Sequence, residues 1–303
     1  MLEEAIDALA LDAASSVVDA TFGGGGHSRA ILDRLGPGGS LVGIDRDPEA
    51  AGRASDLSED PRFEFVSGAY DRALWTMVEG GEKTDAVLFD LGLSSFQVDQ
   101  RERGFSYVGG GPLDMRMDPG SGVSAAEYLD TVGAEELVRV LSRYGDVPRN
   151  EARRVAREVL RRRPLRTTTD LYDAVRAAVG WKERGGNPAK RVFQAVRVRV
   201  NDELGGLARA LQASERLLAR GGRLVVVTFH SGEDRLVKRF ISEREGRCVC
   251  PPELPVCVCG ARPVFRRGAV LSPSAREVGE NPRSASARLR AATRTAEPPG
   301  DGV

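Results

Sequence analysis

Short apolar runs that end in an acidic residue alternate with amphipathic segments in the first part of the chain. Three such runs lie at residues 16–19, 41–45 and 85–90. The acids that close them are Asp19, Asp45 and Asp90. Residues 28–35, between the first two runs, have apolar positions at helical spacing and are followed by a Gly-Pro-Gly stop. This pattern predicts a βαβ unit, and continuous apolar strands are typical of a parallel sheet covered on both faces.

Further segments extend this sheet domain. Strands are also predicted at residues 63–67 and 223–230. Helices are predicted at residues 2–11 and 207–218, and others begin near Pro48 and Ser231. Residues 91–117 show little periodicity and are expected to form a long loop, which is usually a functional feature. Together these elements predict an α/β fold with a doubly wound sheet.

Residues 124–199 change to a purely helical pattern. Apolar positions recur every three or four residues over 137–144, 152–159 and 171–179. Thr169 and Asn187 are the expected N-caps of the last two helices. We therefore expect a discontinuous sheet domain of residues 1–112 and 200–296, an inserted all-helical domain of residues 113–199, and a disordered Pro- and Gly-rich tail of residues 297–303.

A run of four glycines, Gly23 to Gly26, comes shortly after the first predicted strand and is followed by His27. Glycines let backbone N–H groups approach a ligand closely, because no Cβ intervenes. Asp45 lies 19 residues after Gly26. An acid at the end of the next strand can accept hydrogen bonds from both ribose hydroxyls of a nucleoside. The unit is therefore predicted to bind a nucleoside-containing cofactor at the carboxyl ends of the strands.

The glycine pattern narrows the type of cofactor without fixing it. A dinucleotide-binding dehydrogenase would carry Gly-x-Gly-x-x-Gly at the start of the helix, to seat a pyrophosphate. The contiguous glycines of this chain favour a cofactor without phosphate, such as S-adenosylmethionine. A glycine-rich turn without any ligand is a third alternative. The three acids that end neighbouring strands favour a ligand site, because the carboxyl edge of a parallel sheet faces the binding crevice.

Charge is distributed unevenly although the formal net charge of the 303-residue chain is zero. Residues 1–100 contain 19 acidic and 7 basic side chains. Residues 139–166 contain ten arginines and three acids, and residues 262–294 contain eight arginines and two acids. This asymmetry indicates a polyanionic partner. Solvated helix faces would account equally well for any single cluster.

No apolar run approaches the length of a membrane span, and no cationic and apolar leader is recognisable, so a cytoplasmic protein is expected. The four cysteines are Cys248, Cys250, Cys257 and Cys259. Four thiolates can bind zinc, but Cys-x-Cys is tighter than the usual Cys-x₂-Cys spacing. We therefore favour an ordinary reduced loop and assign no metal.

Nine blocks of the sequence together resemble the bacterial small-subunit ribosomal RNA cytosine-N4 methyltransferase family. They lie at residues 19–28, 43–48, 90–95, 103–106, 111–117, 193–197, 200–204, 229–235 and 281–283. The blocks span nearly the whole chain in the order typical of the family. This resemblance implies a class I S-adenosylmethionine methyltransferase fold with an inserted helical domain. It also implies methylation of one cytosine N4 in the decoding region of small-subunit ribosomal RNA. The sequence leaves the oligomeric state open between monomer and homodimer.

The resemblance also implies the residues of the site. Carried over by motif, the contacts to S-adenosylmethionine are Gly25, Gly26, His27, Asp45, Tyr70, Asp90 and Gln97. Where Tyr70 stands, members of the family often have Phe, and either ring can flank an adenine. In the block around His230, Gly232 replaces the usual Leu.

Asp90 is the first candidate for an acceptor of the target N4–H, because such an acceptor turns the nitrogen lone pair toward the methyl group. Alternatively, Asp90 only positions the cofactor. Candidates for holding the base and its flanking phosphate are Ser94, Ser95, Asp114 and Arg116. The base must be unstacked to react, and Phe105 and Tyr107 are candidates to stack on it, unless they only pack the loop. His230 is expected to have a structural role.

Two clusters of basic residues are candidate RNA-backbone contacts, and a solvated helix face explains each about as well. They comprise Arg153, Arg154, Arg157, Arg161, Arg162 and Arg163, and Lys190, Arg191, Arg197 and Arg199. Two other functions remain open. A DNA amino-methyltransferase usually has a Pro-Pro-aromatic step after the fourth strand, and this chain has Leu-Gly-Leu-Ser-Ser there. A non-catalytic RNA-binding assembly factor could keep the cofactor pocket without turnover.

Overall fold

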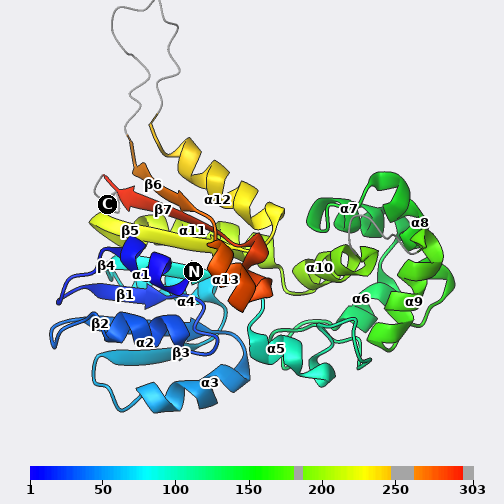
Figure 1. Cartoon of the computed structure of the whole chain (residues 1–303), viewed down its shortest axis with the longest axis horizontal. Coiled ribbons are helices and arrows are strands. Elements are labelled where there is room, and N and C mark those ends of the chain that lie inside the picture. Colours follow the sequence, from blue (N-terminus) through cyan, green and yellow to red (C-terminus); the bar gives the residue numbers. More distant parts are fainter. Residues whose placement is uncertain (181–186, 247–262, 296–303) are drawn as a thin grey trace, which may run out of the picture. The chain divides into compact units, whose positions relative to one another are not determined.

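The computed structural model describes residues 1–180, 187–246 and 263–295 (Figure 1). The chain divides into two compact units. The first consists of Met1–Gly92 and Gly205–Val303, and the second is Leu93–Leu204. We call them the sheet unit and the helical unit. The four cysteines and the expected disordered tail lie outside the described residues.

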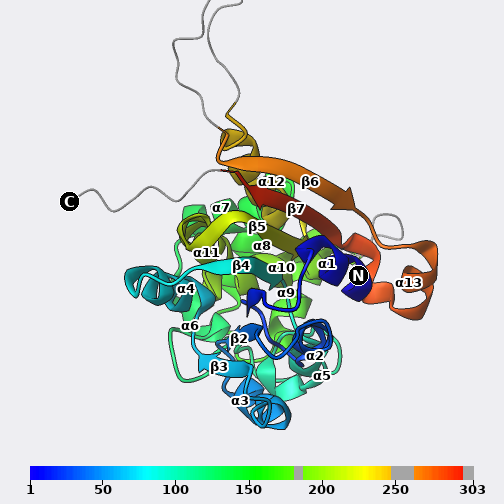
Figure 2. The ribbon, with the colours of Figure 1, turned by 90° about the vertical axis from the view of Figure 1, so that its left-hand side faces the viewer.

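A seven-stranded sheet in the order β3-β2-β1-β4-β5-β7-β6 forms the centre of the sheet unit. Its strands are β1 (Ser16–Asp19), β2 (Ser40–Asp45), β3 (Phe63–Ser67), β4 (Thr84–Asp90), β5 (Leu218–Thr228), β6 (Phe265–Leu271) and β7 (Arg288–Arg294). The first five strands are parallel, whereas β7 runs antiparallel to β5 and β6 antiparallel to β7. Figure 2 shows the twist of the sheet from β3 at one edge to β6 at the other. The doubly wound α/β sheet predicted from the sequence is confirmed.

Strands β6 and β7 were not predicted from the sequence. Both are rich in arginine, and β6 is an edge strand whose residues after Phe265 are all exposed. Its apolar residues therefore do not form the continuous run that marks a buried strand. The β5 strand also begins at Leu218, five residues before the predicted start, because Leu218 already pairs with Thr84 of β4.

Helices cover both faces of this sheet. They are α1 (Leu2–Leu9), α2 (Gly26–Leu32), α3 (Pro48–Ala54), α4 (Tyr70–Glu79), α11 (Glu203–Leu217) and α12 (Ser231–Glu243). A further helix of the unit, α13 (Ala275–Glu280), buries no residue. Two apolar clusters separate the faces. Ile6 and Ile31, from α1 and α2, belong to one cluster, and Leu74, Leu211 and Val237, from α4, α11 and α12, belong to the other. The core thus consists of a layer of side chains on each side of the strands.

Six helices form the described part of the helical unit. They are α5 (Ser95–Asp99), α6 (Ala125–Thr131), α7 (Ala134–Tyr144), α8 (Arg149–Arg161), α9 (Thr168–Val179) and α10 (Pro188–Val200). The N-cap of α6 is Ser124, which forms a capping box with Glu127, and Asn187 caps α10 as predicted. The expected cap at Thr169 is wrong, because the Thr167 hydroxyl accepts the Asp170 N–H at 3.1 Å and α9 begins at Thr168. None of the helices described here is long and apolar enough to span a membrane.

The helical unit begins at Leu93, whereas the sequence placed its start at residue 113. Hydrogen bonds tie the intervening segment to α9 and to the residues that follow it in the helical unit. The Thr168 N–H donates to the Gly111 carbonyl, and the Met115 N–H donates to the Arg103 carbonyl. Phe105 is buried in the apolar cluster of the same helices. The predicted long loop also contains α5 and a 3₁₀ turn, Arg101–Arg103. These tertiary contacts are not visible as sequence periodicity.

Candidate cofactor and methyl-transfer site

The glycine run forms a tight turn between β1 and α2. Gly23 and Gly25 have φ angles of 55° and 75°, in the left-handed region that side chains disfavour. A Cβ at Gly25 would also lie 2.8 Å from Cζ of Phe22. Gly26 is the first residue of α2, and apart from its chain neighbours and the backbone of its own helix, no atom of the described residues lies within 4 Å of the position its Cβ would take. The turn therefore exposes bare backbone at the start of a helix, which suits a closely approaching ligand.

Asp45 ends β2 and holds the glycine turn in place. Its Oδ2 accepts the Gly23 N–H at 2.7 Å, and its Oδ1 accepts the Asp47 N–H at 2.9 Å. Burial raises the pKa of Asp45, although these two hydrogen bonds oppose the shift. The side chain remains partly accessible. Asp45 is thus a partly buried acceptor that lies beside the bare backbone of the turn.

Asp19 ends β1 but lies wholly inside the protein. Its Oδ2 accepts the Ser28 hydroxyl at 2.7 Å, and its Oδ1 accepts the Thr21 N–H at 3.2 Å. Its residue exposure is 0%, and burial raises its pKa. We expected all three strand-ending acids to face the ligand crevice. For Asp19 this expectation is wrong, because the carboxylate is enclosed and fixes the turn instead.

Asp90 ends β4, the strand that neighbours β1. Its backbone N–H donates to the Thr21 hydroxyl at 2.6 Å. Nδ1 of His27 lies 3.6 Å from Oδ2 of Asp90, and the two side chains are 17% and 32% exposed. Burial raises the pKa of Asp90, and the nearby His27 opposes this shift. The structure therefore brings His27 of the glycine turn directly beside the candidate acceptor.

His27 has a second notable feature. Its Nε2 is buried and has no hydrogen-bond partner among the described residues. Buried polar atoms are normally paired, so an unpaired ring nitrogen is unusual. The imidazole thus has one nitrogen near Asp90 and one without a partner.

Tyr70 begins α4, three residues after β3 ends at Ser67. Ser67 pairs with Asp45 in the sheet, so Tyr70 follows the strand next to the one that Asp45 ends. Its ring packs edge-on against Phe89, with centroids 5.6 Å apart. Gly25, Gly26, His27, Asp45, Tyr70 and Asp90 thus all lie within or directly after the strand ends of the sheet unit. This arrangement places backbone donors, carboxylates and one aromatic ring at the carboxyl edge.

Ser94 and Gln97 belong to the helical unit, where they form a capping box at α5. The Gln97 N–H donates to the Ser94 hydroxyl, and the Ser94 N–H donates to Oε1 of Gln97, both at 3.2 Å. Gln97 is 6% exposed. Both side chains are therefore used to begin the helix. The structure gives each a structural partner in addition to the role expected from the family motif.

Asp114 and Arg116 form a tight ion pair with each other. Nη2 and Nε of Arg116 donate to Oδ2 and Oδ1 of Asp114 at 2.7 and 2.8 Å. Partial burial raises the pKa of Asp114, but the hydrogen bonds from Arg116 outweigh it and lower the pKa below its usual value. Both side chains remain about one quarter exposed. The pair is therefore ionised at neutral pH and accessible to a polar group.

Phe105 and Tyr107 do not present free rings for a base. Phe105 is 8% exposed, within the apolar cluster of the helical unit. Tyr107 stacks on Tyr172 with centroids 6.1 Å apart, and it packs edge-on against Phe193. These two rings pack the loop against the helices, as in the alternative to base stacking given in the sequence analysis. Sequence reasoning missed Phe96, an aromatic residue of α5 that is 50% exposed and follows Ser95 directly.

His230 has the structural role expected for it. It is the N-cap of α12, and its Nδ1 accepts the Gly232 and Glu233 N–H groups at 3.2 and 3.4 Å. Oε2 of Glu233 in turn accepts the Phe229 and His230 N–H groups. The glycine that replaces Leu at position 232 supplies one of these donors. A buried capping box of this kind fixes the start of α12.

The sequence of the chain matches the MraW methylase family over residues 1–295. It is 74% identical to "Ribosomal RNA small subunit methyltransferase H" from Rubrobacter xylanophilus, over 98% of this chain and 96% of that protein. The protein of the same description from Thermomicrobium roseum is 46% identical over 98% and 93%. A solved rRNA methylase from Streptococcus thermophilus covers 97% of this chain and 95% of its own at 14% identity, with a TM-score of 0.44, too low to support an inference. The family match and these relatives show that the chain belongs to the MraW methylase family.

Proposed function

We propose that this protein transfers a methyl group from S-adenosylmethionine to N4 of a cytosine in the decoding region of small-subunit ribosomal RNA. The observation that carries the proposal is the meeting of the bare glycine turn with Asp45, His27 and Asp90 at the carboxyl edge of β2, β1 and β4. Membership of the MraW methylase family and the description of its relatives support it. The protein then acts in the cytoplasm, where small subunits assemble.

The residues at this edge fit S-adenosylmethionine. Asp45 is a partly exposed carboxylate that can accept hydrogen bonds from the ribose hydroxyls. Gly26 offers exposed backbone with open space beside it for a ligand, whereas Gly25 is buried and shapes the turn that presents Gly26. We propose that Tyr70 flanks the adenine and that His27 and Asp90 complete the part of the cofactor site that the sheet unit provides. Gln97, in the helical unit, stays a prediction from the family motif. When bound, the cofactor supplies an electrophilic methyl group on a sulfonium.

Asp90 is proposed to act on the target amine. The N4 lone pair of cytosine is delocalised into the ring, so the amine is a poor nucleophile. A carboxylate that accepts an N4–H turns the lone pair out of conjugation and can receive the proton after transfer. His27, 3.6 Å away, is the neighbouring group that opposes protonation of Asp90. The alternative, in which Asp90 only positions the cofactor, predicts a change in cofactor affinity when Asp90 is replaced.

Residues of the helical unit are proposed to hold the substrate. Ser94 follows Asp90 by four residues along the chain. Asp114 and Arg116 form an accessible ion pair whose guanidinium can also donate to a phosphate. The target base must leave its stack to reach the cofactor, so RNA with an unpaired or extruded cytosine is the expected substrate. Ser94, Asp114 and Arg116 are thus proposed to position that nucleotide.

The polar contacts of the helical unit divide the ten basic residues proposed above as RNA-backbone contacts into two sets. Arg161 and Arg162 both donate to Glu158, and Arg163 donates to the Val132 carbonyl. Arg197 is paired with Glu203, and Arg199 lies 3.5 Å from Glu136. The remaining residues are exposed and have no acidic partner in the described parts of the chain: Arg153, Arg154, Arg157, Lys190 and Arg191. We propose that this second set contacts the RNA backbone.

One assay separates the proposal from its alternatives. Purified protein is incubated with labelled S-adenosylmethionine and with small subunits that lack the modification, with free RNA, or with DNA. Label on cytosine N4 of the subunit RNA supports the proposal. Transfer to DNA would identify a DNA amino-methyltransferase, and RNA binding without transfer would identify an assembly factor. A nearly assembled subunit is the expected best substrate, since it offers a broad polyanionic surface to the helical unit.

A further inference from the structure

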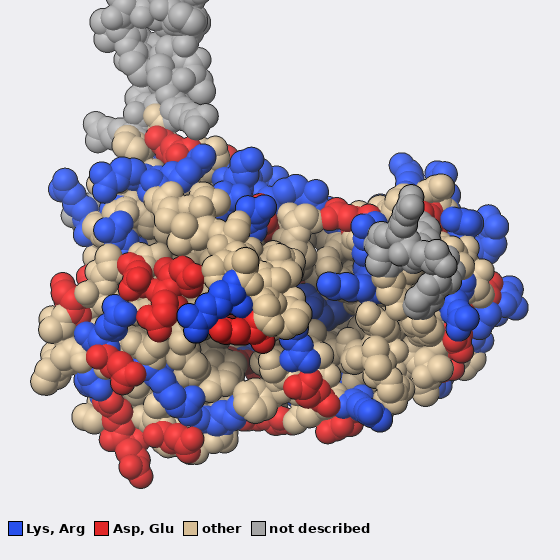
Figure 3. All heavy atoms as spheres, viewed as in Figure 1, with Lys and Arg blue, Asp and Glu red and all other residues tan. Residues whose placement is uncertain are grey.

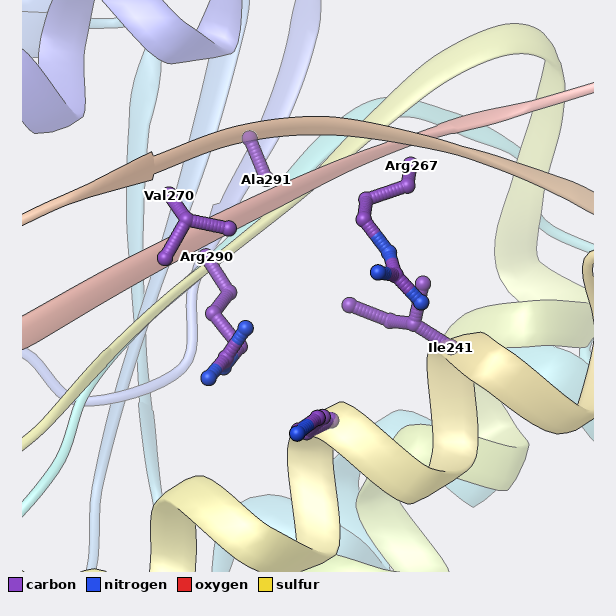
Figure 4. A pocket seen from close by; sticks show the side chains of 6 residues that line it. Ile241, Arg267, Val270, Arg290 and Ala291 are labelled. Carbon is purple, nitrogen blue, oxygen red and sulfur yellow. The ribbon is translucent and has the colours of Figure 1, made fainter.

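A small hollow opens in the sheet unit between helix α12 and the two antiparallel strands β6 and β7 (Figure 4). It is lined by Lys238, Ile241, Arg267, Val270, Arg290 and Ala291. Half of these side chains are cationic, and each of the three cations comes from a different element. The arginines reach from the strands toward the helix. None of these residues belongs to the proposed cofactor site.

The strand register places three arginines on one face of the sheet. Arg288 and Arg290 are two residues apart on β7, so their side chains leave the same face. Arg267 of β6 pairs with Ala292, two residues beyond Arg290, and paired residues also share a face. Leu289 lies in the apolar cluster of the opposite face. From Arg288 to the level of Arg267 the row extends about 14 Å, at a rise of about 3.4 Å per residue.

Acidic side chains fix two of the cations that line the hollow. Nε and Nη2 of Arg290 donate to the two oxygens of Asp234 at 2.7 and 3.0 Å. Nη2 of Arg267 donates to Glu245 at 2.7 Å. Lys238 is exposed, and it has no ion pair within residues 1–180, 187–246 and 263–295. The hollow therefore carries excess positive charge on side chains whose positions are partly fixed in advance.

The same region of the surface is basic beyond the hollow. Figure 3 shows Lys and Arg side chains gathered over α12 and β6. Arg235, Arg239 and Arg266 are exposed members of these two elements. A concentration of cations on one side of a protein attracts a polyanion and increases its rate of association.

The row of arginines begins near the proposed methyl-transfer site. On β5, Val227 pairs with Asp90 and Val226 pairs with Arg290. Since neighbouring strands are about 4.8 Å apart, the backbones of Asp90 and Arg290 are about 10 Å apart. Arg288 is exposed and pairs with Thr228, the last residue of β5, so it lies at the same carboxyl edge of the sheet.

We propose that Arg288, Arg290, Lys238 and Arg267 form a track that binds the phosphate backbone of the RNA flanking the target cytosine. The proposal rests on the function proposed above, and it assigns to the sheet unit an RNA contact separate from the helical unit. A single strand carries one charge per about 3.4 Å of duplex axis, so a track of this length spans about four phosphates. Guanidinium groups already held by carboxylates still have N–H donors for phosphate oxygens.

The test uses the full chain and an unmodified fragment of small-subunit RNA that contains the target region. The variants are Lys238→Glu, Arg267→Glu and the conservative Lys238→Arg. Arg72→Glu is the matched control, because Arg72 is exposed on α4 and the change in charge is the same. RNA affinity is measured at several salt concentrations, and methyl transfer is measured as KM and kcat for the RNA. S-adenosylmethionine affinity and melting temperature show that each variant is folded.

We expect Lys238→Glu to weaken RNA binding about tenfold and to reduce the slope of log K against log salt by about 1. KM should rise with little change in kcat, while Lys238→Arg and Arg72→Glu behave as the wild type. If Lys238→Glu binds RNA with the affinity and the salt slope of the wild type, the proposed track is wrong. This conclusion does not depend on Arg267→Glu, which loses its ion pair with Glu245 and can fail to fold. An equal loss in Arg72→Glu would also overturn the track. If the variants lose RNA binding but the wild type transfers no methyl group, the track stands and the proposed function fails.

Discussion

Replacing Asp45 by Ala removes the acceptor proposed for the cofactor ribose. In the structure this carboxylate also accepts the Gly23 and Asp47 N–H groups, at 2.7 and 2.9 Å. The variant therefore loses two contacts to the cofactor and two that shape the turn. Because the two effects are measured separately, by ligand affinity and by stability, each can be assigned.

The expected magnitude follows from the number of hydrogen bonds. A hydrogen bond to an ionised group contributes about 1.5–3 kcal/mol, so two ribose contacts contribute about 3–6 kcal/mol. Since each 1.4 kcal/mol is a factor of ten, Kd for S-adenosylmethionine should rise by about 10²–10⁴-fold. The burial of Asp45, which raises its pKa, offsets part of the contribution of its two hydrogen bonds to the turn, so their loss should lower the free energy of unfolding by about 1–3 kcal/mol, with no loss of the fold.

Calorimetric titration with S-adenosylmethionine and thermal unfolding are the two assays. Asp47→Ala is the matched control, because the Asp47 side chain accepts the Glu49 N–H as the N-cap of α3 and has no proposed cofactor contact. This control should lose about 1 kcal/mol of stability and keep cofactor affinity within about threefold. If the Asp45→Ala variant binds S-adenosylmethionine as tightly as the Asp47→Ala variant, Asp45 is not the acceptor for the ribose hydroxyls.

Four further predictions concern other residues. Asp90→Asn should lower kcat by about 10²–10⁴-fold, whereas S-adenosylmethionine affinity should fall far less, because the amide still offers a hydrogen-bonding group to the cofactor but cannot receive the proton. Burial raises the pKa of Asp90 in the folded protein, so its ionisation lowers the free energy of unfolding as the pH rises above the pKa of Asp90 in the unfolded chain. Unfolding measured at several pH values should therefore show a smaller loss of stability with rising pH in Asp90→Asn than in the wild type. Tyr107→Ala should destabilise the helical unit by about 3 kcal/mol while S-adenosylmethionine still binds; wild-type stability would show that its packing is unimportant. Arg153→Glu with Arg157→Glu should reduce the salt slope of RNA binding by about 2, whereas Arg161→Glu, whose side chain is already paired, should change it less.

The sheet was predictable where burial made the pattern continuous. Strands β1, β2 and β4 are apolar runs closed by an acid, and the parallel pairing places those acids at one edge. Strand β6 could not be found this way, because the side chains after Phe265 face solvent and its residues pair with β7 residues 18 to 29 positions further along the chain. Edge strands of this kind are defined by tertiary contacts.

The site was predictable at the level of motifs and not at the level of contacts. The glycine turn and Asp45 are as close as their spacing implied. Asp19 has the same position at the end of a strand, yet Ser28 and Thr21 enclose it. Phe105 and Tyr107 have the chemistry for stacking on a base, but the partners that bury them, such as Tyr172 and Phe193, come from distant helices. Accessibility decides these roles, and it is a property of the folded chain.

The central claim is tested most directly by the position of the transferred methyl group. Small subunits that lack the modification are incubated with the protein and labelled S-adenosylmethionine, and the modified nucleoside is identified by mass spectrometry after digestion of the RNA. The account predicts one labelled cytosine per subunit, methylated at N4, and loss of the label with Asp90→Asn. Label on another atom or base, or full transfer by Asp90→Asn, would contradict it.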